Sequence, residues 1–181
     1  MTRILAIFAL LAVAPATSAL ADGWHWFNPL GGQAGNDAIT VGAGAPSSAI
    51  RISSSQSGDL QWYYIGLPGL PAGAEIDSVT VCYEVETPDS YISQVRITRM
   101  TTPDAQLVVF DDPTDLVSTD PECVSYAVPN PPEVAGAMTI AFRCDFASAG
   151  DWIEIGAIGI RLAMSPTPVS DDEIASRHGA R

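Results

Sequence analysis

Short runs rich in Thr, Val, Ile, Tyr and Trp, separated by Gly, Pro, Asp and Ser, make up most of the sequence after residue 37. This composition is typical of β-strands, whose pleated surface suits branched and aromatic side chains. No stretch of about 12 residues between residue 38 and the C-terminal tail has the apolar spacing of a helix. We therefore expect about nine strands, over Ala38–Ala43, Ala49–Ser54, Leu60–Gly66, Ile76–Glu86, Ile92–Met100, Gln106–Phe110, Cys123–Val128, Ala137–Phe146 and Trp152–Leu162.

Apolar and polar side chains alternate within several of these runs. From Val79 to Glu86, Val or Tyr alternates with Thr, Cys or Glu, and Met138–Phe146 and Cys123–Val128 show the same period of two. Because successive side chains of a strand point to opposite faces, each run has one face in the core and one in solvent. The pattern predicts an all-β, antiparallel β-sandwich or barrel.

The same alternation predicts which of the three cysteines face outward and which faces the core. Cys82 and Cys123 have the parity of outward-facing residues, whereas Cys144 has the parity of the core. Two cysteines on the same side of one sheet can meet, but one inside and one outside cannot. We expect a Cys82–Cys123 disulfide and a buried free thiol at Cys144, with the absence of any disulfide as the alternative.

The last predicted strand changes parity at a glycine. Ile153 and Ile155 lie on one face by their spacing, whereas Ile158, Ile160 and Leu162 lie on the other, with Gly156 between the two sets. A β-bulge at Gly156 would turn all five side chains inward.

The first 21 residues have the features of a secretory signal: a positive start at Arg3, an apolar run over Ile4–Val13 and the Ala19-Leu20-Ala21 cleavage pattern. The apolar run is shorter than the roughly 20 residues of a spanning helix. We expect a secreted, periplasmic or cell-surface protein that does not insert into a membrane once the signal is removed. The rest divides into an aromatic and Gly-rich arm at 22–37, the sandwich at 38–162 and a flexible tail at 163–181.

Charge excludes several partners. The net charge is −13, and all eight basic residues are Arg. Nucleic-acid binding needs clustered cations that release counterions from phosphate, and anionic membranes repel such a chain. The sequence therefore predicts neither partner, and the absence of Lys excludes Schiff-base and P-loop chemistry.

Acidic residues crowd the segment between residues 111 and 122. Carboxylate oxygens are the ligands that calcium prefers, so this segment is a candidate structural calcium site. The spacing does not match an EF-hand, and a solvated loop is the alternative. The candidate ligands are Asp111, Asp112, Asp115, Asp120 and Glu122, and we expect no other cofactor.

The aromatic run Trp62-Tyr63-Tyr64 is the candidate ligand-binding element. Alternation puts Trp62 and Tyr64 on one strand face and Tyr63 on the other, so one face must be buried. Exposed aromatic rings stack against the C–H faces of sugars. Trp152 carries the same two interpretations, ligand binding or core packing.

Catalytic patterns are sparse. His25 lies in the arm and His178 in the tail, so neither is placed for a catalytic triad, and Gly-x-Ser-x-Gly is absent. A glycoside-type hydrolase would need two carboxylates across a cleft. We do not expect an enzyme, and this hydrolase remains the third hypothesis.

Two segments carry a resemblance. Leu70–Val81 contains an LP-x-GA-x-I turn that leads into a Val-rich strand, and Ile158–Leu162 contains I-x-I-R. The sequence thereby resembles uncharacterised exported bacterial β-sandwich proteins. The resemblance implies a jelly-roll-like fold and carries no catalytic residues.

These observations predict an exported, non-enzymatic β-sandwich with a binding or adhesion role and an extracellular glycan as its ligand. The alternative is an extracellular structural protein that assembles with itself, through an uncovered strand edge or an exposed apolar patch.

Overall fold

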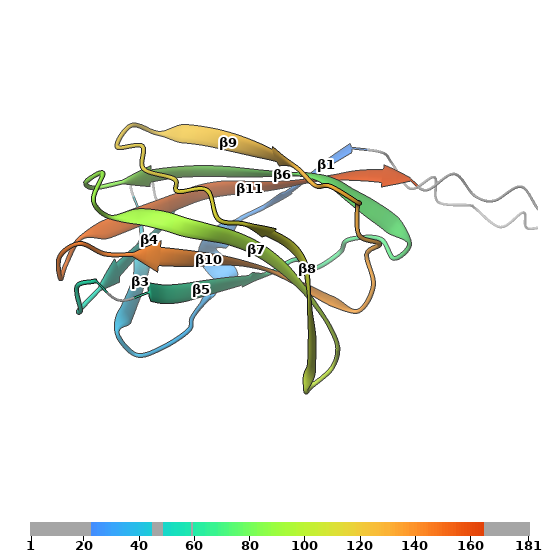
Figure 1. Ribbon diagram of the computed structural model, residues 1–181, viewed down its shortest axis with the longest axis horizontal. Coiled ribbons are helices and arrows are strands. Elements are labelled where there is room, and N and C mark those ends of the chain that lie inside the picture. The colour runs from blue at the N-terminus through green and yellow to red at the C-terminus, as the bar shows by residue number, and fades with distance from the viewer. Residues whose placement is uncertain (1–22, 45–48, 59, 165–181) are drawn as a thin grey trace, which may run out of the picture.

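Two antiparallel sheets pack face to face in the computed structural model, which describes residues 23–44, 49–58 and 60–164 (Figure 1). The six-stranded sheet has the order β3-β4-β11-β6-β9, with β1 also paired to β11. Its strands are β1 (Gly23–Phe27), β3 (Ile39–Ala43), β4 (Ile50–Ser54), β6 (Ala74–Val85), β9 (Glu122–Ala127) and β11 (Trp152–Met164). The predicted antiparallel β-sandwich is confirmed, and all nine predicted strands are present within a few residues of their expected bounds.

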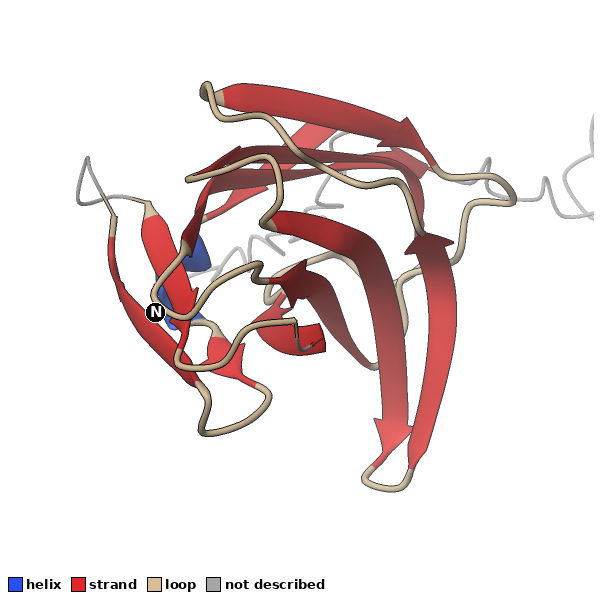
Figure 2. Ribbon diagram, turned by 60° about the vertical axis from the view of Figure 1, so that its left-hand side comes forward, coloured by secondary structure: helices blue, strands red, loops and turns tan. Residues whose placement is uncertain are grey.

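The five-stranded sheet has the order β2-β5-β10-β7-β8. Its strands are β2 (Gln33–Ala34), β5 (Leu60–Gly66), β7 (Tyr91–Thr102), β8 (Ala105–Asp112) and β10 (Ala137–Asp145). Figure 2 shows the long hairpin of β7 and β8 extending away from the rest of the sandwich.

The core lies between the two sheets and follows the predicted alternation. Val79, Val81 and Val85 on β6 are buried, as are Ile140 and Phe142 on β10. The register of β11 with β6 shifts between Ile155 and Ile158, on either side of Gly156. The predicted bulge is thus confirmed, and the five apolar side chains that flank it are all in the core: Ile153, Ile155, Ile158, Ile160 and Leu162.

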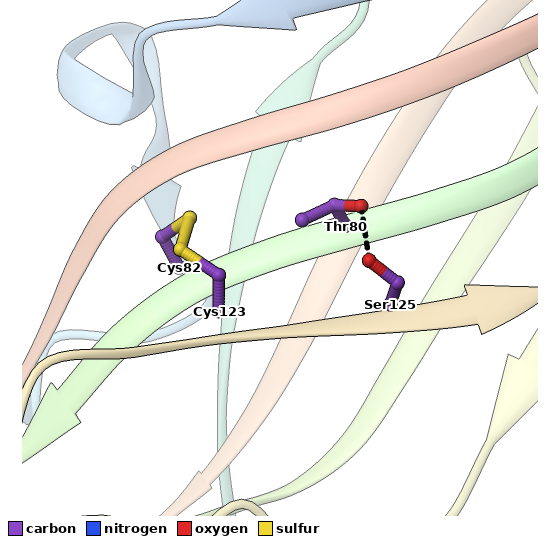
Figure 3. The surroundings of a disulfide bond; sticks show 4 residues. All are labelled: Thr80, Cys82, Cys123 and Ser125. Atoms are coloured by element: carbon purple, nitrogen blue, oxygen red, sulfur yellow. Dashed lines mark hydrogen bonds between the residues drawn. A yellow bond between two sulfur atoms is a disulfide. The ribbon is translucent and has the colours of Figure 1, made fainter.

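The disulfide between Cys82 and Cys123 joins β6 to β9, which lies at an edge of the six-stranded sheet. The two cysteines are directly opposite each other in the register, and two positions along, the Thr80 and Ser125 hydroxyls hydrogen-bond at 2.7 Å (Figure 3). Cys144 is buried and free. The predicted pairing and burial of the three cysteines are therefore confirmed.

The described part of the arm, residues 23–37, is part of the sandwich, so the prediction that it lies outside the strand series is wrong. It forms β1, a short 3-10 helix η1 (Pro29–Gly31) and β2. The physical reason is an open strand edge: β4 pairs with β11 only from Trp152 to Ile155, and β1 pairs with the following part, from Ile158 to Leu162. The inward side chains of β1 extend the core, because Phe27 packs against it.

The predicted signal peptide at 1–21 lies outside the described residues, as does the predicted tail after Met164. In the part of the chain that the structure describes, no helix has the length and apolar character needed to cross a membrane.

Candidate functional site

Trp62 and Tyr64 lie side by side on the outer face of the five-stranded sheet. Both are on β5, two residues apart, so they share a face. Their rings stack with centroids 6.2 Å apart and planes inclined by 19°. Tyr64 is 37% exposed and Trp62 is half-buried, which leaves aromatic surface accessible to a ligand.

Tyr63 points the other way, and its prediction as a ligand-binding residue is wrong. The side chain is fully buried in the core, where its hydroxyl donates to the Pro29 carbonyl at 2.9 Å. Burial raises the pKa of Tyr63 to about 12, so the hydroxyl remains a donor at physiological pH. The residue fixes η1 against β5.

A polar network begins at the Trp62 ring. The Arg96 guanidinium lies 4.9 Å from the ring centroid and forms two hydrogen bonds with Asp111, of 3.1 and 3.2 Å. Gln94 Nε2 donates to Asp111 Oδ1 at 2.6 Å, and Arg143 Nη1 donates to Gln94 Oε1 at 3.3 Å. These contacts hold charged and amide groups next to the aromatic pair. We call this surface the platform; it consists of Trp62, Tyr64, Gln94, Arg96, Asp111 and Arg143.

Strand register brings the platform together from four strands. Arg143 on β10 lies opposite Trp62 on one side and opposite Gln94 on the other, and Arg96 on β7 lies opposite Asp111 on β8. Ala141 is the β10 residue between Tyr64 and Arg96, and it is only 1% exposed because its longer neighbours cover it. Alternation identified the two aromatic residues, but it contains no information on which strands are neighbours. The polar members were therefore missed as ligand-binding residues.

Trp152 does not belong to this surface. It lies on β11 of the other sheet, and the Arg51 guanidinium is 4.3 Å from its ring centroid. The structure therefore does not bring Trp152 together with Trp62 and Tyr64 as one ligand-binding group.

The five acidic residues predicted to bind calcium are not gathered around one point. Among the described residues, no three His, Cys, Asp or Glu side chains are placed to hold a metal ion. Asp111 pairs with Arg96, Asp112 accepts the backbone N–H of Thr114 at 2.9 Å, and Glu122 accepts the Tyr83 hydroxyl. Asp115 and Asp120 lie on the segment that connects β8 to β9. The charges are dispersed because β8 and β9 belong to different sheets.

A small cleft of about 210 Å³ on the outer face of the six-stranded sheet is lined by Glu84, Glu122 and Glu154, next to the disulfide. Glu84 and Glu154 are cross-strand neighbours. The Glu154 carboxylate is buried and accepts from Arg51 at 2.6 Å. This ion pair ties β4 to β11.

No protein-family model matches the sequence, and a comparison with curated proteins finds no match. Among solved structures, the chain is similar to the family 11 carbohydrate-binding module of Clostridium thermocellum in complex with a β-1,3-1,4-mixed-linked tetrasaccharide. The TM-score is 0.51 and the identity 10%, over 81% of this chain and 99% of that one.

It is also similar to the CBM22-1–GH10 modules of xylanase 10B from Clostridium thermocellum, complexed with xylohexaose. Here the TM-score is 0.51 and the identity 14%, over 79% of this chain and 28% of the xylanase chain. The chain thus spans less than a third of that structure. At these identities the similarity establishes the β-sandwich fold and nothing more.

Proposed function

We propose that the protein is an exported, non-enzymatic glycan-binding β-sandwich whose binding surface is the platform. The observation that carries the proposal is the stacked Trp62–Tyr64 pair beside the Arg96–Asp111 ion pair on one outer sheet face. A sugar ring has apolar C–H faces and hydroxyls around its edge. Indole and phenol rings pack on those faces, while Arg, Asp and Gln groups hydrogen-bond the hydroxyls.

The shape of the platform favours an oligosaccharide over a single sugar. Its members lie on β5, β10, β7 and β8, which are consecutive neighbours in the sheet. Three strand spacings of about 4.8 Å make the surface roughly 14 Å wide across the strands. A glycan chain that crosses the strands would contact the aromatic pair at one end and Asp111 at the other.

The hydrogen bonds within the platform reduce the cost of binding. Asp111 is held by Arg96 and Gln94, and Gln94 is held in turn by Arg143. Side chains that are already ordered lose little rotamer freedom when a ligand arrives. The two similar structures, both solved with bound oligosaccharides, support the same class of ligand for this chain.

Export is part of the proposal and is supported by the disulfide. Disulfides persist in oxidising compartments and are rare in the cytosol, and the N-terminal segment has the pattern of a secretory signal.

Binding to a panel of immobilised polysaccharides, followed by titration calorimetry with the matching oligosaccharides, tests the function. We expect Trp62→Ala to weaken binding by about 1.5–3 kcal/mol, the value of one large buried side chain, which is about ten- to a hundredfold in Kd. Trp152→Ala is the matched control, because it removes the same side chain from the other sheet. Absence of binding to every glycan, or equal losses in the two variants, would refute the proposal.

A further inference from the structure

We infer that a cleft between β1, the end of β5 and the start of β10 is a second saccharide site, which takes a neutral sugar ring against Trp26. The inference shares its ligand class with the proposed function but depends on none of the residues of the platform. β1 belongs to the segment that was predicted to be an N-terminal arm.

Trp24 and Trp26 form an exposed stacked pair on the outer face of the six-stranded sheet. They are 41% and 58% exposed, with ring centroids 5.7 Å apart and planes inclined by 25°. Soluble proteins rarely leave such large apolar rings in water side by side unless the rings meet a partner. The pair is therefore a candidate surface for a ligand that stacks.

The position of the pair is fixed by Gly159 on β11, which lies opposite Trp26. A Cβ atom at this position would lie 3.0 Å from ring atoms of both Trp24 and Trp26. Only a residue without a side chain allows both indoles to lie this close to β11. The aromatic surface is thus a defined part of the fold.

Trp26 also borders a cleft with a volume of about 670 Å³. This volume is within the range of small-molecule sites, about 300–1,000 Å³. Three of its lining glycines, Gly31, Gly66 and Gly69, leave space open, because a Cβ added at any of them would meet no atom within 4 Å. Besides Trp26, the residues that line it include Phe27, Asn28, Leu67, Leu70 and Thr139.

The lining selects for a neutral amphipathic ligand. None of the described residues that line the cleft is charged, although the chain carries a net charge of −13. A charged ligand would lose hydration there without gaining an opposite charge. Asn28 Oδ1 already accepts the Leu30 N–H at 2.9 Å, but an entirely apolar ligand would offer no hydrogen bond to Asn28 Nδ2, the Thr139 hydroxyl or the backbone groups of the lining. A neutral sugar ring satisfies both conditions, since it offers C–H faces to Trp26 and hydroxyls to the polar groups.

The cleft adjoins the platform but does not overlap it. Gly66 and Thr139 are directly opposite each other in the register, two positions beyond Tyr64 and Ala141. Trp26, by contrast, comes from β1 of the other sheet. The two sites are therefore separable by substitution.

The test is a titration of the full chain with neutral tetrasaccharides of glucose, xylose, mannose and galactose, and with tetragalacturonic acid as the charged probe. The NMR signals of the four indole N–H groups, assigned with single Trp→Phe variants, report on each site. We expect the Trp26 signal to shift with at least one neutral probe and not with the acidic one. Trp26→Ala should weaken this binding at least tenfold and leave the Trp62 titration unchanged.

Gly159→Ala provides a second variant, in which both Trp side chains remain but are displaced. Its matched control is Gly42→Ala on β3 of the same sheet, where an added Cβ meets no atom within 4 Å. We expect Gly159→Ala to lose the Trp26 response and Gly42→Ala to keep it.

The outcomes separate this inference from the proposed function. A response at Trp62 alone overturns the second site and leaves the platform intact, whereas a response at Trp26 alone supports the cleft and refutes the platform. A response of Trp26 to the acidic probe equal to that with neutral probes overturns the inference. So does a Trp26 shift that depends on protein concentration without sugar, because it identifies the pair as a contact between two copies.

Discussion

Removal of the Cys82–Cys123 disulfide is expected to destabilise the fold by about 4 kcal/mol. The two cysteines are 41 residues apart in the sequence, so the bond closes a loop of about 40 residues in the unfolded chain. The loop-entropy relation for this length gives about 4 kcal/mol at 25 °C. For a domain of this size, each kcal/mol lost from the free energy of unfolding lowers the melting temperature by about 2–4 °C. We therefore expect the melting temperature to fall by about 8–16 °C.

The assay is denaturant and thermal unfolding of the Cys82→Ser, Cys123→Ser double variant beside the wild type. The Thr80–Ser125 hydrogen bond and the β6–β9 ladder do not depend on the sulfur atoms, so the double variant removes the cross-link alone. Cys144→Ala keeps the disulfide, and reducing agent should lower its stability as much as that of the wild type. A loss below about 1 kcal/mol in the double variant would refute the reasoning and show that strand pairing alone holds β9.

Three further substitutions or treatments test other features. Tyr63→Phe removes one of the two donors to the Pro29 carbonyl, which keeps the Gly32 N–H, and should cost about 0.5–1.5 kcal/mol in chemical unfolding; an unchanged midpoint would contradict the role of Tyr63 in holding η1 against β5. Burial raises the pKa of the Cys144 thiol to about 12, so iodoacetamide should not modify Cys144 in the folded protein at pH 8. Because the folded state holds this proton more tightly, stability should fall as the pH rises from about 9 towards 12, and less steeply in Cys144→Ala. Gly136→Ala forces a side chain into φ 65°, with its Cβ 2.4 Å from the Met100 carbonyl oxygen, and should cost at least about 1–2 kcal/mol; wild-type stability would contradict this geometry.

Parity along single strands was enough to predict the core, the disulfide and the bulge. Each of these depends on which way a side chain points, and alternation fixes that direction once one face is buried. The correct pairing of Cys82 with Cys123 needed one further condition, that β6 and β9 belong to the same sheet, and the structure meets it.

Contacts between strands could not be predicted in the same way. Arg96 on β7 lies opposite Asp111 on β8. This pairing could not be read from the sequence, because the register of the two strands shifts between Ile97 and Thr98. β1 was missed because Trp24 and Trp26 point outward while His25 and Phe27 point inward, so both faces of the strand are aromatic and no apolar-polar alternation remains.

The shared edge of β11 also has a consequence for the order in which the chain folds. β4 pairs with the first part of this edge and β1 with the second, and β6 pairs along the opposite side. β1 is separated from its partner by roughly 130 residues of sequence, and contacts of such high contact order form slowly. The six-stranded sheet therefore cannot assemble until β11, the strand that joins β4 and β1 to β6, has been synthesised. We expect the chain to stay incompletely folded until then, and a polypeptide in that state can be threaded through a narrow translocation pore, as the proposed export requires.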